Sequence, residues 1–205
     1  ALSGEGADEL FGGYPRQRYD VALDRIGPLG RRLLPSFLAA VGRPVSPRLR
    51  RRIAMPAGLA RQLDWSRVFE AEAIDELVAA PLPGEDALLE AAAELARDWE
   101  RLAATDPVNA RLETDRALFL PGDLLPKVDR MSMAVSLEVR VPYLDEDLAD
   151  YVLALPGSSK VRGTEGKAVL RRVARRLLPA KILRRPKQGF DVPIGAWLRG
   201  PLREA

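Results

Sequence analysis

The chain has 205 residues, of which 47% are hydrophobic, so it can build the core of one domain or of two small helical subdomains. Its 32 basic and 29 acidic side chains leave a formal net charge of only +3, which argues against a nucleic-acid-binding surface. The absence of cysteine and histidine excludes disulfides, thiol nucleophiles, imidazole bases and metal sites built from nitrogen or sulfur ligands. Any chemistry must use carboxylates, lysine, arginine, hydroxyl groups, backbone amides or a hard metal ion.

The sequence also bears on where the protein works. No apolar run approaches the roughly 20 residues of a membrane span, and no signal segment is present, so we expect a cytoplasmic protein without membrane contacts. The sequence starts at Ala1 without an initiator methionine and in the middle of a motif, so we expect a piece of a longer polypeptide.

The first segment, residues 2–14, has four glycines clustered around Glu5, Asp8 and Glu9. Glycines let the backbone approach a ligand closely, free amides bind anionic oxygens, and the carboxylates can act as bases or magnesium ligands. This pattern predicts a nucleotide-binding loop, with a short strand ending at Leu2. An equally weighted alternative is a tight turn whose Asp8 and Glu9 begin a helix and favour its positive N-terminal end.

Residues 16–104 show apolar positions at helical spacing, with breaks at glycines and prolines. Within this segment, residues 85–104 predict an amphipathic core helix whose stripe includes Leu95, Trp99 and Leu102. The four arginines of residues 48–52 are interpreted as a solvated helix face or as a surface for the rest of the polypeptide.

The last part of the chain predicts further helices at residues 109–120, 128–135, 145–155 and 167–178, followed by a loop at 185–190. The first of these should stop at Pro121-Gly122. Charged residues lie among apolar ones between positions 127 and 145, and we expect several, including Glu138 and Arg140, to be partly buried and paired as structural supports. The fold class expected for these residues is mainly α.

Lysine is scarce, with five residues against 27 arginines, and two of the five have neighbouring glycines in loop-like sequence. These are Lys167 and Lys187. A compact ammonium group suits a phosphate where a planar guanidinium does not fit, although surface lysines are an equally good explanation.

Four motifs, in this order, resemble the synthetase domain of the glutamine-hydrolysing asparagine synthetases. They are LSGEGADELFGGY at 2–14, DRMSMA at 129–134 leading into LEVRVPYLD at 137–145, GKAVLR at 166–171, and RPKQGF at 185–190. Tyr143 stands where many relatives have phenylalanine, and the helical middle of the chain has no recognisable counterpart.

The resemblance implies that these residues belong to an α/β synthetase domain of the ATP-pyrophosphatase (adenine nucleotide alpha hydrolase-like) type. Residues 1–205 would be its C-terminal portion, with an ATP-site loop at 1–20, a helical insert at 21–110, and a helical region with a basic C-terminal loop at 111–205. The pyrophosphate loop and an N-terminal glutaminase domain would lie elsewhere in the same polypeptide, so this piece alone is expected to be inactive. A homodimer is compatible with this arrangement.

The resemblance also implies a reaction, in which ATP with Mg²⁺ activates the side chain of aspartate as β-aspartyl-AMP and ammonia then displaces AMP. Ser3 and Gly4 would contact ATP, and Glu5 would be an acid-base or orienting group beside the activated aspartate. Asp8 would orient this loop. Lys167 would neutralise charge on the departing pyrophosphate, and Lys187 would help to cover the phosphates. No metal-ligand set is expected from the chain itself.

Two other functions remain open at this stage. An adenylating synthetase could use another acceptor, because relatives in β-lactam, peptide-cyclising and surface-glycan pathways share these motifs. The chain could also be a non-catalytic helical interaction module, which the absence of a pyrophosphate loop upstream would favour.

Overall fold

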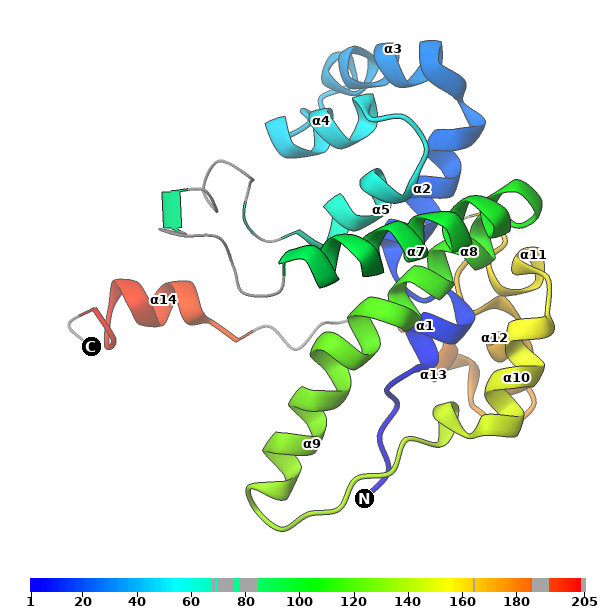
Figure 1. The fold of residues 1–205 in the computed structure, drawn as a ribbon, viewed down its shortest axis with the longest axis vertical. Coiled ribbons are helices and arrows are strands. Elements are labelled where there is room, and N and C mark those ends of the chain that lie inside the picture. Colours follow the sequence, from blue (N-terminus) through cyan, green and yellow to red (C-terminus); the bar gives the residue numbers. More distant parts are fainter. Residues whose placement is uncertain (68, 70–75, 78–84, 164, 186–191, 204–205) are drawn as a thin grey trace. The chain divides into compact units, whose positions relative to one another are not determined.

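The computed structural model describes residues 1–67, 69, 76–77, 85–163, 165–185 and 192–203. Every extended regular element in these residues is helical, and the only β pairings among them are isolated bridges (Figure 1). The expected mainly α character is therefore confirmed for the described residues. The chain divides into two compact units, residues 1–170 and residues 171–205.

The helices follow one another with short connections. Before the centre of the chain they are α1 (Ala7–Phe11), α2 (Pro15–Arg25), α3 (Gly27–Ala40), α4 (Pro47–Ala54), α5 (Leu59–Ser66) and α7 (Glu85–Thr105). After it they are α8 (Pro107–Thr114), η1 (Asp115–Leu124), α9 (Leu125–Met133), η2 (Pro142–Leu144), α10 (Glu146–Ala154), α11 (Gly157–Lys160), α12 (Ala168–Ala174), α13 (Ala180–Leu183) and α14 (Ile194–Arg199).

Local sequence explains where several helices begin. Helices α2, α4 and α8 each have proline in the first turn, where its missing N–H removes no intrahelical hydrogen bond. The Asp106 carboxylate accepts from the backbone N–H groups of Val108 and Asn109, and Asp145 caps α10 by accepting from Leu148 N. The prediction for residues 145–155 is confirmed, whereas α12 is shorter than the predicted 167–178 helix.

The predicted stop at Pro121-Gly122 is wrong. Helices α8, η1 and α9 follow one another without a break from Pro107 to Met133, with Pro121 inside η1. This central stretch is a π-helix, and Leu125 N–H donates to the carbonyl of Leu120, five residues earlier. The wider turn absorbs the residue that lacks an N–H, so the chain continues helically.

Two apolar clusters form the core of the first unit. One joins α2, α8 and the segment after α11 through Val21, Leu112 and Val161, and the other packs Leu10 and Phe11 of α1 on α10. Helix α7 lies against α8 and buries Trp99, with Leu95 and Leu102 half-buried, which confirms that part of the predicted stripe. No helix in the described residues is long and apolar enough to cross a membrane.

A buried ion-pair network connects α2, α5 and α8. Asp20 is fully buried, and its carboxylate accepts from Nε of Arg61 and Nε of Arg111, each at 2.6 Å, and from Trp65 Nε1 at 3.1 Å. Asp24, one turn later on α2, accepts from the other ends of the same two guanidinium groups. Carboxylates at i and i+4 thus bind two arginines that come from distant parts of the sequence.

Replacing Asp20 by asparagine should destabilise the protein by about 3–5 kcal/mol, because Arg61 and Arg111 would remain buried with half of their counter-charge. Urea denaturation measures the free energy of unfolding. The matched control is Asp98→Asn, since Asp98 pairs with Arg101 on the surface, and it should cost about 0–1 kcal/mol. Similar losses in both variants would contradict a structural role for the buried network.

The arginine run of residues 48–52 is only partly a solvated face. Arg52 is buried, and its Nε donates to Asp64 of α5 at 2.7 Å, while Arg51 pairs with the same carboxylate. By contrast, the pair of Glu138 and Arg140 forms on the surface, with 69% and 76% of the two side chains exposed. The pairing that we predicted there is confirmed, but the burial is wrong, because no described element covers this segment.

Lys160, at the end of α11, is buried, with 1% of its surface exposed. Its ammonium donates to Oδ1 of Asn109 at 2.8 Å, and burial lowers the pKa of Lys160 to about 8, although Asp106 and Glu113 oppose the shift. The native state therefore releases this proton near pH 8, whereas the unfolded chain keeps it until about pH 10.5.

We therefore expect the free energy of unfolding to rise with pH between 8 and 9.5, because the unfolded state binds one more proton there, with a slope of at most about 1.4 kcal/mol per pH unit. Lys160→Met should remove this slope, and Lys127→Met, which changes an exposed lysine, should keep it. Denaturation curves at several pH values measure both. An unchanged slope in Lys160→Met would assign the effect to other groups.

Candidate active site

The glycine-rich N-terminal segment is fixed by the segment that follows α9. Leu2 and Arg140 form a parallel β-bridge, in which Ser3 N donates to Arg140 O at 2.8 Å and Arg140 N donates to Ala1 O at 2.9 Å. Figure 1 shows these two segments side by side near the N-terminus. The strand predicted to end at Leu2 is reduced to this single bridge, which holds residues 3–5 at the start of α1.

Two glycines shape the turn into and out of α1. Gly6 has a φ of +84°, and a Cβ there would lie 2.4 Å from Cδ2 of Leu144, so both conformation and space favour glycine. Gly12 ends α1 with a φ of +76°. Before the turn, Glu5 is half-buried, and its backbone N–H donates to Ser3 Oγ at 3.4 Å. No hydrogen bond or ion pair of the Glu5 carboxylate occurs in the described residues, so this group is available to a ligand.

The structure brings together two of the predicted site residues, Asp8 and Lys167. Nζ of Lys167 lies 2.9 Å from Oδ1 of Asp8, with both side chains about one quarter exposed. Lys167 has a φ of +54°, unusual for a residue with a Cβ, and its N–H donates to Phe11 O at 3.1 Å. The backbone of residue 167 is thus held against the end of α1, which aims the ammonium group at Asp8.

Close backbone packing surrounds this ion pair. A Cβ at Gly13 would lie 1.6 Å from Oδ1 of Asp8 and 2.4 Å from Cε of Lys167, and one at Gly166 would lie 2.3 Å from the carbonyl oxygen of Gly12. Only glycine leaves room for the pair at these positions. The half-exposed ammonium group, held by a single carboxylate, can attract an anion such as a phosphate from solvent.

Glu9, next to Asp8, is buried, with 1% of its surface exposed, and its Oε1 accepts from the hydroxyl of Tyr14 at 2.5 Å. Burial raises the pKa of the Glu9 carboxyl above its ordinary value, against the hydrogen bond from Tyr14 that lowers it. Arg16 stacks 4.1 Å from the centre of the Tyr14 ring and pairs with Asp115 at 3.1 Å. Sequence analysis treated Glu9 only as a helix-start residue, and its place inside the glycine motif was the signal for this buried contact.

The remaining predicted site residues are distributed as follows. Ser3 and Gly4 lie in the segment held by the β-bridge, and no printed contact joins Glu5 to Lys167 in the described part of the chain. Lys187 lies outside the described residues. Within those residues no group of three or more acidic side chains is placed to hold a metal ion, so any Mg²⁺ would have to arrive with a nucleotide.

Comparisons with known proteins place these features in a family. The family model described as asparagine synthase matches residues 1–205. A Mycobacterium tuberculosis protein, provisionally named as a glutamine-hydrolysing asparagine synthetase, is 36% identical over 202 residues, covering 97% of this chain and 30% of the relative. Asparagine synthetase (glutamine-hydrolysing) 1 of Bacillus subtilis is 32% identical over 216 residues, covering 100% of this chain and 32% of the relative.

A mammalian relative shows a shorter match. The glutamine-hydrolysing asparagine synthetase of Bos taurus is 37% identical over 106 residues, covering 47% of this chain and 18% of the relative. No solved structure matches the chain significantly. The chain spans about a third of the length of the bacterial relatives that it matches over almost its whole extent. Because the family model covers every residue and these relatives exceed 30% identity, the chain belongs to the asparagine synthase family.

Proposed function

We propose that the chain forms part of a ligase that converts the side-chain carboxylate of aspartate into the amide of asparagine. An oxygen of that carboxylate attacks the α-phosphorus of Mg-ATP, and the bond to pyrophosphate breaks, which leaves β-aspartyl-AMP. Ammonia then attacks the activated carbon, loses a proton, and displaces AMP. The observation that carries this proposal is the family match over all 205 residues, together with relatives named asparagine synthetase.

The proposal gives each site residue a role. Lys167, held by Asp8 at 2.9 Å, neutralises negative charge that develops on the departing pyrophosphate. Ser3 and Gly4 bind the nucleotide through hydroxyl and backbone groups. Glu5 accepts or orients the proton of the attacking ammonia, because its carboxylate has no partner within the described residues. Lys187 covers the phosphates from the C-terminal loop.

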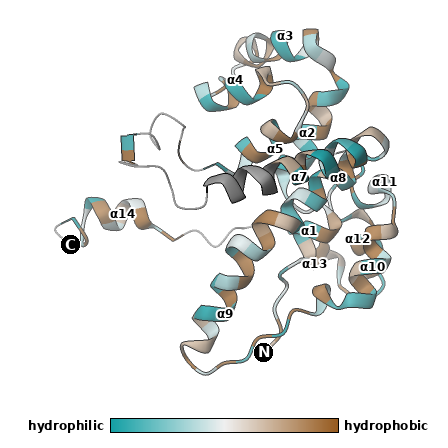
Figure 2. Ribbon diagram, in the orientation of Figure 1, coloured by the Kyte–Doolittle hydropathy of each residue, from teal (hydrophilic) through white to brown (hydrophobic). Residues whose placement is uncertain are grey.

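We further propose that these helices complete an α/β domain of the ATP-pyrophosphatase type. The parallel bridge of Leu2 and Arg140 supports this, because parallel strands are stable only within sheets that are covered on both faces. Exposed Met131, Val135 and Leu137 lie on the same segment, and Figure 2 shows hydrophobic residues along α9 and after it. Residues 1–20 are the ATP-site loop in this proposal, 21–110 a helical insert, and 111–205 the C-terminal region.

Product identity tests the reaction. The polypeptide that carries this chain, given aspartate, ammonium and Mg-ATP, should form asparagine, AMP and pyrophosphate in equal amounts. Formation of ADP and phosphate would contradict adenylation, and AMP formation only with another carboxylate would identify a different acceptor. The isolated 205 residues should bind Mg-ATP weakly in calorimetric titration, because other residues supply the rest of the nucleotide pocket.

A further inference from the structure

The positive charge of the chain is concentrated near its C-terminal end. Residues 166–190 contain nine lysines and arginines and no aspartate or glutamate. The second compact unit, residues 171–205, carries ten basic and two acidic side chains, whereas the whole chain has a formal net charge of only +3. The field around this unit is therefore positive whatever local contacts its arginines make.

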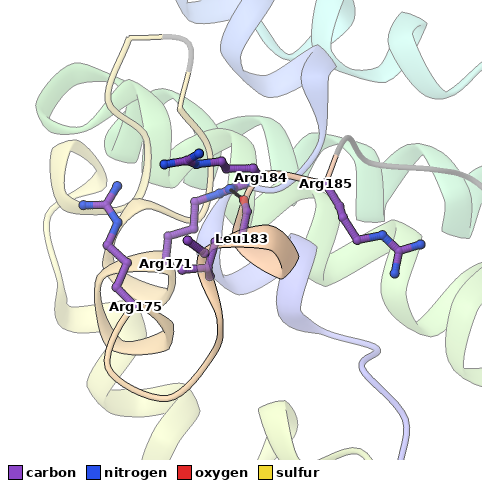
Figure 3. Close-up of a pocket in the computed structure, with 6 residues that line it drawn as sticks. Arg171, Arg175, Leu183, Arg184 and Arg185 are labelled. Carbon is purple, nitrogen blue, oxygen red and sulfur yellow. Dashed lines mark hydrogen bonds between the residues drawn. The ribbon is translucent and has the colours of Figure 1, made fainter.

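Three of these arginines converge on one pocket. Arg171 and Arg175 lie one turn apart, and Arg184 directly follows α13. Figure 3 shows their side chains gathered on one side of α13, with Arg185 pointing away from them. The pocket has a volume of about 660 Å³, and Ala180 and Leu183 contribute an apolar part of its lining.

A hydrogen bond fixes the shape of this pocket. NH1 of Arg171 donates to the carbonyl oxygen of Leu183 at 2.9 Å, which ties the end of α12 to α13. Arg171 is therefore partly used by the fold. Arg184 is exposed and forms no ion pair with any described carboxylate, so its five N–H donors face solvent.

We propose that this arginine pocket, defined by Arg171, Arg175 and Arg184, binds a polyphosphate anion, either free or as the phosphate tail of a nucleotide. The planar fork of a guanidinium group binds two phosphate oxygens at once, and the like charges of three arginines are relieved by one multiply charged ligand. The volume lies within the range of small-molecule sites. An acidic protein segment is less suited, because a closed group of three forks offers few contacts along an extended chain.

This site is separate in composition from the one used in the proposed function. None of Ser3, Gly4, Glu5, Asp8 or Lys167 lines it. The two sites can therefore be distinguished by substitution. A polyphosphate bound here would act as a second ligand of the enzyme and not as the substrate of the amidation.

Calorimetric titration of the whole chain with inorganic tripolyphosphate tests the proposal. The double variant R175Q/R184Q should weaken binding at least about tenfold, because it removes two charge-assisted contacts while Arg171 keeps the pocket folded. The charge-matched control R176Q/R199Q, which lies outside the pocket, should change the affinity less than about twofold. Circular dichroism of both variants should match that of the wild type.

Further arms separate the sources and the rivals. Equal affinity for tripolyphosphate and ATP would assign binding to the phosphates alone, and tighter binding of ATP would add a nucleoside contact with the apolar lining; both support the proposal. Equal weakening in R175Q/R184Q and the control would overturn it, because charge alone would then explain binding. Loss of binding in Lys167→Ala but not in R175Q/R184Q, or tighter binding of polyglutamate than of tripolyphosphate, would also overturn it.

Discussion

Replacing Glu5 by glutamine should lower the rate of asparagine formation by about 10² to 10⁴-fold, which is the range for losing a general acid-base group. Glutamine keeps the size of the side chain but cannot take up a proton. The structure supports this choice of residue, since Glu5 is half-buried in a segment held by the β-bridge, and its carboxylate is not used by any described neighbour. Quenched-flow measurement of asparagine formation checks the result.

Two further measurements define what the Glu5 variant means. Pyrophosphate release should fall less than asparagine formation, because the carboxylate acts in the second step. Glu138→Gln is the matched control, since this exposed carboxylate pairs with Arg140 on the surface, and it should leave both rates within about twofold. An equal fall of both steps in Glu5→Gln would instead assign Glu5 to the placement of aspartate.

Replacing Lys167 by alanine should slow adenylate formation by about 10²-fold or more, comparable to the loss of one preorganised electrostatic donor. The ammonium group is already positioned before any ligand arrives, by the contact of Nζ with Asp8 and by the backbone bond to Phe11. Its attraction to the pyrophosphate therefore requires little reorganisation. Pyrophosphate release in a single turnover is the measurement.

The control for this experiment is Lys127→Ala, which removes an exposed lysine of α9 and should leave the rate unchanged. Lys167→Arg should restore little activity, because a planar guanidinium is larger than an ammonium and Gly13 leaves little space beside Cε. Wild-type rates in both steps for Lys167→Ala would remove this residue from the mechanism.

The helical architecture of the described residues followed from the sequence because helical periodicity is a local signal. Asp145 and Trp99 illustrate this, since a cap and an apolar stripe are both readable within a few residues. The stop predicted at Pro121 failed because it assumed α-helical hydrogen bonding, whereas a π turn accommodates the proline. The burial predicted for Glu138 and Arg140 failed because apolar neighbours in sequence do not show what covers them in space.

The site was predictable as a set of residue types, but its pairing was not. The glycine motif indicated Glu5 and Asp8, and the rarity of lysine indicated Lys167, yet the contact of Asp8 with Lys167 joins positions far apart in the chain. The same reason hid the bonds of Asp20 to Arg61 and Arg111, which depend on how three helices pack. The roles of the site residues remain predictions.

The bridge between Leu2 and Arg140 has a consequence for synthesis of the protein in the cell. The amino group of Ala1 donates to the carbonyl of Glu138, 137 positions later, and the N-terminal segment makes its β contacts only with this distant strand. At about 5–20 residues per second, a ribosome takes roughly 7–30 s to add that length of chain. During this interval the glycine-rich loop has no partner strand, so the nucleotide-binding segment is emerged but unstructured while the helices after it can already fold.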